Sequence, residues 1–297
     1  MGQRLTPYPN LGPNGPLQGF RPFPATDPWN TPIDRSPVDP NSALILRAIL
    51  TRNPRANVHP DFSTGISGIP YSVVGKETRA APLSAIEYPD ESDKGAYPIP
   101  ANAPVEGGPS SDSDRHVLVL DRDGGKLYEL YRAFPDGRGG WKAGSAAIYD
   151  LHTNTKRPDF WTSADAAGLP VFPGLARYDE VAQGEIRHAL RFTLQKTRRA
   201  FVPPATHYAS RFKEADLAPM GMRVRLKKSV SLTGLSPQAL VLARCIQTYG
   251  LMLADNGGDF FVSGAPNPKW DDDQLNQLKR FTPLDFEVVK MGKLTEG

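Results

Sequence analysis

The 297-residue chain contains a single cysteine, and this scarcity excludes two kinds of site. One thiol, Cys245, cannot close an intramolecular disulfide and cannot supply a thiolate metal cluster. It lies in an apolar helical pattern, so we expect it to be a buried small hydrophobe rather than a nucleophile.

Long apolar runs and an excess of one charge are also missing. No stretch approaches the roughly 20 apolar residues of a membrane span, so we expect none. The 35 Lys and Arg residues nearly balance the 32 Asp and Glu residues, and the basic runs at 198–199 and 223–228 are short. Nucleic-acid binders concentrate positive charge in a stripe, so we interpret these runs as solvated strand faces and expect no nucleic-acid partner.

The signatures of several enzyme classes do not occur in the sequence. It has no P-loop, no G-x-G-x-x-G and no G-x-S-x-G, which argues against nucleotide binding and against a serine nucleophile elbow. Its five histidines show no adjacent metal-ligand spacing. We therefore predict no cofactor and no metal.

Proline is abundant, with 30 residues, and it divides the chain into two parts. Residues 1–112 form a proline-rich arm and a loop-rich segment, broken by a short helix over 43–50 that Asn41 or Ser42 caps. Aromatic residues such as Trp29 are interleaved with the prolines, so we expect the arm to pack on a core. Residues 113–297 form that β-rich core, and we expect one integrated domain.

Regular structure begins with a hairpin. Two strands, 115–121 and 126–132, flank Arg122-Asp-Gly-Gly125, a strong turn signal. Helices are predicted after Ser236 and after Asp271, with Gln274 as a capping partner. Further strands are predicted over 146–151, 186–194, 222–227, 251–254, 260–263 and 286–290. The pattern favours a mostly β fold, an antiparallel sandwich or barrel of jelly-roll type with a few short peripheral helices.

The densest group of ionisable residues lies between Trp161 and Thr193. From this stretch and a later turn we select four candidate catalytic residues: Asp165, Glu180, His188 and Asp255. On a strand, His188 shares the apolar face with Leu190, which fits a tuned acid or base as well as a plain core histidine. The carboxylates have structural alternatives too, as a helix cap, a solvated side chain and a turn residue.

Aromatic and basic neighbours complete the candidate site. The rings of Trp161, Tyr178 and Tyr208 could stack on sugars, and Arg191 and His207 could also bind substrate. A metal site built from His188 and His207 is the alternative use of the histidines.

Several segments together resemble a known family. DPWNTPI (27–33), WTSADAAGLP (161–170), RYDEV (177–181), EIRHALRFT (185–193) and ADNG (254–257) look like a family of bacterial proteins, apparently exported, without an assigned activity. The resemblance covers nearly the whole chain and supplies no catalytic residue. It implies a secreted or periplasmic protein whose signal peptide has been removed.

We therefore expect an exported carbohydrate-active protein that cleaves polysaccharide by carboxylate and histidine acid-base chemistry, as a glycoside hydrolase or a polysaccharide lyase. One alternative is a non-catalytic glycan-binding or structural surface protein, with the arm joining copies into a homo-oligomer. The other is a metal-dependent hydrolase or oxidase that uses His188 and His207.

Overall fold

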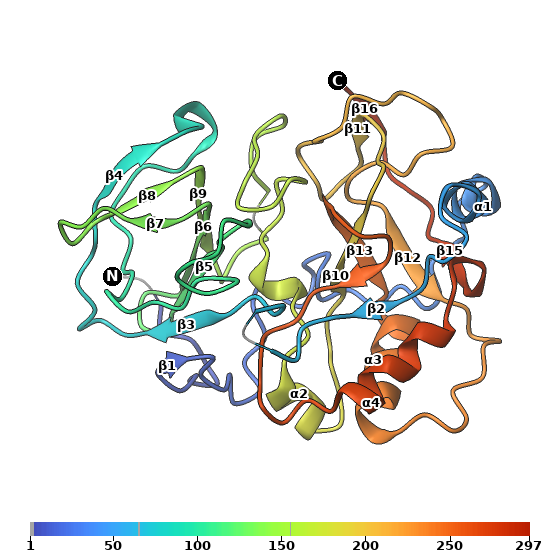
Figure 1. Cartoon of the computed structure of the whole chain (residues 1–297), viewed down its shortest axis with the longest axis horizontal. Helices are drawn as coiled ribbons and strands as arrows, with labels where there is room; N and C mark the ends of the chain where they lie inside the picture. The colour runs from blue at the N-terminus through green and yellow to red at the C-terminus, as the bar shows by residue number, and fades with distance from the viewer. Residues whose placement is uncertain (1–2, 65, 155) are drawn as a thin grey trace.

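The computed structural model describes residues 3–64, 66–154 and 156–297, and the fold is strand-rich with several sheets and few helices. Two larger sheets lie side by side, one on the left and one on the right of Figure 1. The chain between them, drawn in yellow-green, carries the candidate site.

The left sheet is built around the predicted hairpin, which the structure confirms. Strands β5 (Val117–Asp121) and β6 (Lys126–Tyr131) pair antiparallel around Gly125, whose φ of 65° suits a glycine. β9 (Ser145–Asp150) extends the sheet beyond β6. On the other side β3 (Tyr71–Val74) runs parallel to β5 and pairs with β1 (Gly12–Pro13). β3 lies in the segment predicted to be loop-rich, so that expectation was wrong there.

The right sheet has the order β15-β12-β13-β10-β14-β2. Its central pair, β10 and β13, is parallel, with a register shift after Phe192. A parallel pair needs a long crossover rather than a tight turn. The strands are β2 (His59–Pro60), β10 (Leu190–Leu194), β12 (Arg223–Leu226), β13 (Leu251–Asn256), β14 (Phe261–Val262) and β15 (Phe286–Val288).

Two smaller sheets complete the strands. One joins β4 (Leu83–Ile86), β8 (Trp141–Ala143) and β7 (Phe134–Pro135), and the other joins β11 (Ala200–Phe201) to β16 (Thr295–Glu296). Parallel pairs occur in three of the four sheets. The expected antiparallel arrangement is therefore corrected to mixed sheets, because β3, β4 and β10 each pair with a strand distant in sequence.

The helices lie mainly on the right-hand side of the molecule. Asp271 caps α4 as predicted, since its side chain accepts from the amides of Asp273 and Gln274. The α-helices are α1 (Ser42–Arg52), α2 (Tyr178–Ala182), α3 (Pro237–Thr248) and α4 (Asp272–Leu275). The short 3-10 turns are η1 (Pro89–Glu91), η2 (Phe172–Gly174), η3 (Asn276–Arg280) and η4 (Pro283–Asp285).

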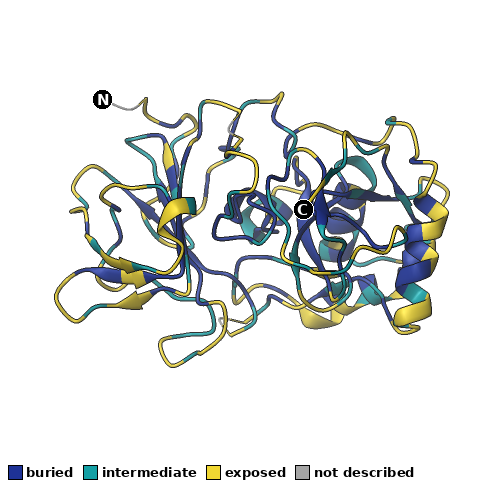
Figure 2. Ribbon diagram, turned by 90° about the horizontal axis from the view of Figure 1, so that it is seen from above, coloured by how far each residue is buried: buried dark blue, intermediate teal, exposed yellow. Residues whose placement is uncertain are grey.

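One large apolar core spans both halves. It contains Leu120 of β5 and Phe192 of β10, and also Leu5, Leu17 and Trp29 of the proline-rich arm. Figure 2 shows buried residues along both sheets and exposed residues on the outer loops. The arm therefore packs on the core of its own chain, and burial of its apolar side chains stabilises that position.

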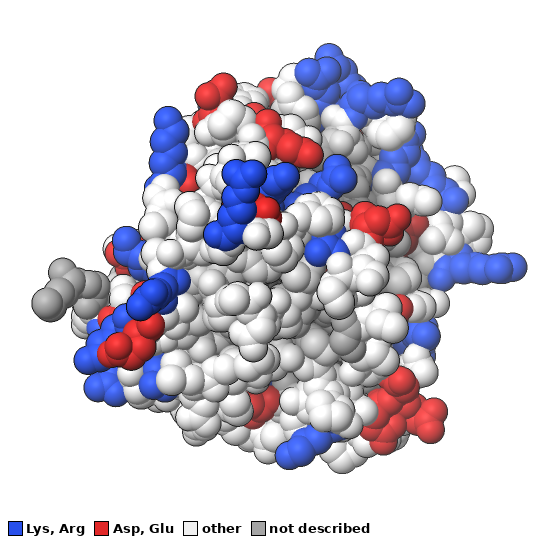
Figure 3. Space-filling model, turned by 60° about the vertical axis from the view of Figure 1, so that its left-hand side comes forward, with Lys and Arg blue, Asp and Glu red and all other residues white. Residues whose placement is uncertain are grey.

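The surface carries charges of both signs. On the face in Figure 3, Lys and Arg gather toward the upper edge and sides, while the centre is largely uncharged. In the described part of the chain, no helix combines the length and the apolar character needed to cross a membrane.

Candidate active site

The segment 162–171 runs between the two larger sheets and belongs to neither (Figure 1). The hydroxyl of Ser145, on β9, donates to the carbonyl of Ser163. The amide of Ala167 donates to the carbonyl of Ala254, on β13, at 2.9 Å. Both sheets therefore hold the segment in place.

The segment is also tightly folded on itself. Ser163 Oγ accepts from the amide of Asp165 at 2.9 Å and donates to the carbonyl of Leu169 at 2.6 Å. Gly168 has a φ of 72°, and a Cβ there would lie 2.0 Å from Thr206 Oγ1. Only glycine fits this position, so the turn presents Asp165 in one orientation.

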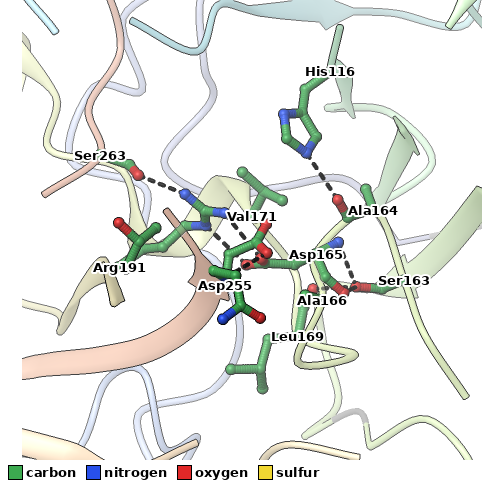
Figure 4. A network of polar contacts seen from close by, with 12 residues as sticks. His116, Ser163, Ala164, Asp165, Ala166, Leu169, Val171, Arg191, Asp255 and Ser263 are labelled. Atoms are coloured by element: carbon green, nitrogen blue, oxygen red, sulfur yellow. Dashed lines mark hydrogen bonds and ion pairs between the residues drawn. The ribbon is translucent and has the colours of Figure 1, made fainter. Parts of the chain in front are cut away.

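An ion network centres on Arg191 of β10 (Figure 4). Its Nε and Nη2 donate to the two carboxylate oxygens of Asp165 at 2.8 and 2.9 Å, a bidentate pair. Nη2 also reaches Asp255 of β13 at 3.1 Å, and Nη1 donates to Ser263 Oγ at 2.6 Å. The Asp165 side chain is fully buried, whereas 19% of the Asp255 side chain is exposed.

In this network, Asp255 is the carboxyl whose pKa departs from the ordinary value of an aspartate. Burial raises its pKa, the charge of Asp165 raises it further, and Arg191 opposes both, so that the pKa is about 8. Arg191 already directs two nitrogens at Asp165, which leaves Asp255 undercompensated. The protonated form of Asp255 is therefore favoured relative to an ordinary aspartate.

A buried histidine fixes the neighbouring backbone. His116 Nδ1 lies 2.6 Å from Glu106 Oε2, and its Nε2 lies 2.8 Å from the carbonyl of Ala164. Burial alone would lower the pKa of His116, but the Glu106 carboxylate outweighs it and raises the pKa to about 9. With both nitrogens protonated, the imidazolium donates to both acceptors and anchors Ala164 beside Asp165.

Glu129 on β6 anchors the far end of the same segment. Its two oxygens accept from the amides of Val171 and Phe172 at 2.9 and 2.8 Å. Burial raises the pKa of Glu129 to about 7, against the two amide hydrogen bonds that lower it. This carboxyl is fully buried, so it positions the segment rather than reaching a substrate.

A pocket of about 340 Å³ lies at this network, and we name it the acidic pocket. Its charged lining residues are all carboxylates, and no described Lys or Arg lines it. Tyr88, half exposed, and Tyr131 add aromatic faces. The lining comprises Tyr88, Glu91, Asp114, Tyr131, Ser145, Thr162, Ser163, Ala164, Asp165, Ala166, His207, Ala209, Asp255 and Asn256.

The predicted site residues separate into groups. Asp165, Asp255 and His207 line the acidic pocket, and Arg191 holds two of them. Tyr208 stacks on His207 with ring centroids 5.5 Å apart, so it lies next to the pocket.

Glu180 and His188 form a different cluster with Arg177. Arg177 Nη2 lies 2.9 Å from Glu180 Oε2 and 2.9 Å from His188 Nε2. Glu180 is not solvated, since only 14% of its side chain is exposed, and burial is outweighed by Arg177 and His188, which lower its pKa. We name these three residues the closed cluster.

The structure corrects the strand predicted over 186–194, which begins at Leu190. Before that point the amide of Ala189 donates to the carbonyl of Trp29 in the arm rather than to a neighbouring strand. His188 Nδ1 is also engaged, 2.8 Å from the Ala189 carbonyl. His188 is therefore held in the closed cluster and does not line the acidic pocket.

Two predicted aromatic residues lie elsewhere. Tyr178 lines a separate pocket of about 290 Å³ that also includes Arg177. Trp161 lies over Arg157, whose guanidinium carbon is 5.5 Å from its ring. Neither residue is in the acidic pocket.

Among the titratable lining residues, sequence reasoning missed four: Tyr88, Glu91, Asp114 and Tyr131. Tyr88 and Glu91 come from the loop-rich segment, and Asp114 precedes β5. No local motif marks them, because the fold alone brings them to Asp165. Of the four, only Tyr131 lies on an element that the sequence predicts, the second strand of the hairpin.

One group of described residues has the spacing of metal ligands. Ligating atoms of Glu106, Asp114 and His116 lie within 4.8 Å of one another. Both ring nitrogens of His116 already have hydrogen-bond partners, and its raised pKa favours a proton over a metal ion. His188 and His207 do not belong to a common group of this kind among the described residues.

No protein-family description matches this chain, and no significant relative was found among curated proteins or solved structures.

Proposed function

We propose that the protein is a carbohydrate-active hydrolase that acts at the acidic pocket. The observation that carries the proposal is the position of Asp255, a partly exposed carboxyl with a raised pKa in a pocket lined by carboxylates, hydroxyls and tyrosines. Glycoside hydrolysis uses one protonated and one ionised carboxyl group. Polar groups with aromatic faces are also the surroundings that a sugar requires.

In this mechanism Asp255 is the general acid. Its proton passes to the glycosidic oxygen, and the bond between that oxygen and the anomeric carbon breaks. Water adds to the carbon and gives its proton to Asp114, the catalytic base. Asp114 is exposed, lines the same pocket as Asp255, and its charge helps to raise the pKa of Asp255.

The buried groups set the pKa and the position of Asp255, and they do not contact the substrate. Asp165 supplies the negative charge that raises the pKa of Asp255, and Arg191 holds both carboxyls in position. His116 and Glu129 fix the segment that carries Asp165. Export, taken from the family resemblance, is part of the proposal, and it would give the protein access to extracellular polysaccharides.

An activity screen on a polysaccharide panel tests the proposal, with and without a chelator, reading reducing ends and absorbance near 235 nm. We expect new reducing ends that resist the chelator, and their loss in Asp255→Asn. Asp272→Asn, an exposed acid on α4, is the matched control and should keep full activity. New ultraviolet absorbance would indicate lytic cleavage instead of hydrolysis. Loss of activity with the chelator would indicate a metal-dependent reaction instead.

A non-catalytic glycan-binding role is the second candidate, supported by the half-exposed Tyr88 ring at the pocket. It predicts that oligosaccharides bind without cleavage. Binding that weakens in Tyr88→Ala, together with no products across the panel, would favour this role over the hydrolase.

A further inference from the structure

A further pocket, of about 470 Å³, lies among the proline-rich arm, the residues Asn154, Lys156 and Arg157, the turn at 168–170 and the start of β12. Its walls are mainly apolar and include Phe23, Trp29 and Pro170. It shares no lining residue with the acidic pocket. We name it the Arg223 pocket.

Two charged side chains in this pocket lack ion pairs. Arg223 Nη2 donates to the carbonyls of Thr31 and Tyr249, but its Nε is buried without a partner. Asp27 is 4% exposed and uses one oxygen to accept from the amide of Trp29 at 2.9 Å. Within the described residues, neither group has an opposite charge within 4.0 Å.

The pKa shifts of Arg223 and Asp27 also indicate that neither charge is fully compensated by an opposite charge. Burial lowers the pKa of Arg223 to about 10, and Asp27 is the carboxylate that opposes this shift. Burial also raises the pKa of Asp27, against its amide hydrogen bond and the charge of Arg223. The charge of each group shifts the pKa of the other, but the two groups do not form a direct ion pair.

The other cations that line this pocket are already paired. Arg157 forms an ion pair with Asp93, and Lys156 Nζ lies 2.6 Å from Asp159. A ligand therefore meets a guanidinium and a carboxylate that each have neutral hydrogen-bond partners but no ion pair within the described residues, between apolar walls. A simple anion would leave Asp27 unpaired, and a simple cation would leave Arg223 unpaired.

We propose that the Arg223 pocket binds a free amino acid with an apolar side chain, its carboxylate facing Arg223 and its ammonium facing Asp27. The guanidinium suits a carboxylate because its positive charge has only neutral carbonyl partners, and a carboxylate would supply the missing opposite charge. The apolar side chain lies against Phe23, Trp29 and Pro170, where it loses contact with water. This site is separate from the proposed hydrolase site and does not depend on it.

The test is calorimetric titration of the full chain with L-phenylalanine, 3-phenylpropionate and 2-phenylethylamine at pH 7. The second probe lacks the ammonium and the third lacks the carboxylate. We expect L-phenylalanine to bind roughly 10-fold or more tightly than either, because each truncation leaves one buried charge unpaired. No binding of L-phenylalanine, or equal binding of all three probes, would overturn the proposal.

Variants locate the two contacts. Arg223→Gln should remove the preference for L-phenylalanine over 2-phenylethylamine, and Asp27→Asn should remove the preference over 3-phenylpropionate. Asp27→Asn keeps an oxygen that can accept from the Trp29 amide, so it tests the site even if Arg223→Gln fails to fold. Lys142→Gln, which removes an exposed cation on β8 outside this pocket, should leave the affinity for L-phenylalanine unchanged within about 2-fold. Retained preferences in folded Asp27→Asn would contradict the assignment.

Discussion

Arg191 and Arg177 are two buried arginines that each hold a carboxylate and a second titratable group, and the two clusters differ in how the arginine divides its contacts between them. In the closed cluster, Arg177 contacts both Glu180 and His188 at 2.9 Å, and no member side chain is more than 14% exposed. Among the contacts of Arg191 with carboxylates, the two shorter ones go to Asp165, and Asp255 receives a single one at 3.1 Å.

The difference appears in the proton affinities. The pKa of Glu180 is lowered, because Arg177 and His188 together outweigh burial. The pKa of Asp255 is raised to about 8, because burial and the charge of Asp165 outweigh Arg191. Similar residue types thus build a structural ion cluster in one place and a solvent-facing acid in the other. A raised pKa at a pocket is the better guide to a reactive group.

The largest difference between the two clusters is expected when the acid Asp255 is removed. Asp255→Asn should lower the rate of polysaccharide cleavage roughly 100- to 10,000-fold, the usual range for loss of a general acid. In the unmodified protein the rate should fall as pH rises through about 8, where Asp255 loses its proton. Initial rates between pH 5 and 10 measure both effects. A falling limb that persists in any residual activity of Asp255→Asn would assign it to another group.

Removal of a carboxylate from the closed cluster should act on stability instead. Glu180→Gln leaves Arg177 buried without its carboxylate and should lower the free energy of unfolding by about 3–5 kcal/mol. Urea denaturation at pH 6 measures this loss. Asp255→Asn is the control and should change stability by less than about 1 kcal/mol there, because Asp255 is already neutral in the folded state. Equal losses in the two variants would remove the distinction between the clusters.

His116 links stability to pH. Its folded pKa of about 9 lies above the ordinary value of 6.5, so its contribution is fully present below pH 6.5 and is lost as pH rises through 9. His116→Gln should therefore remove about 1–3 kcal/mol at pH 6 and much less at pH 10. Unfolding free energies at a series of pH values test this. A loss that does not vary with pH would show that His116 is neutral in the fold.

The smallest effect is expected at the mouth of the acidic pocket. Tyr88 is half exposed, so Tyr88→Ala should change stability by no more than about 0.5 kcal/mol. Affinity for an oligosaccharide substrate should fall about 3- to 10-fold through loss of the aromatic face. Titration of the inactive Asp255→Asn variant with and without Tyr88→Ala isolates this contact. Unchanged affinity would place the sugar away from Tyr88.

Local signals in the sequence predicted the local parts of the fold. The hairpin of β5 and β6 follows from Asp-Gly-Gly between two strand-forming runs, and the cap of α4 follows from Asp271. Strand β3 was missed because its partner β5 lies far along the chain, and parallel pairing leaves no turn signal.

The candidate site was predicted only in part, because some of its residues carry a local sequence signal and others do not. Asp165 stands out in the turn of WTSADAAGLP, Arg191 on a predicted strand and Asp255 at the end of an apolar strand, and the structure brings all three together. Asp114 and Tyr88 carry no such signal, since only tertiary packing places them at the pocket. His188 follows an apolar alternation that predicts a strand, but its contacts with Arg177 and with the Ala189 carbonyl fix a different backbone.

The most direct test of the comparison is a carboxyl titration by ¹³C NMR on protein labelled at aspartate and glutamate side chains. We predict one aspartate resonance that titrates near pH 8 and is absent from Asp255→Asn, while no resonance near pH 8 is lost in Glu180→Gln. Complete ionisation of every aspartate by pH 6 would contradict the account, because Asp255 could then not serve as the acid.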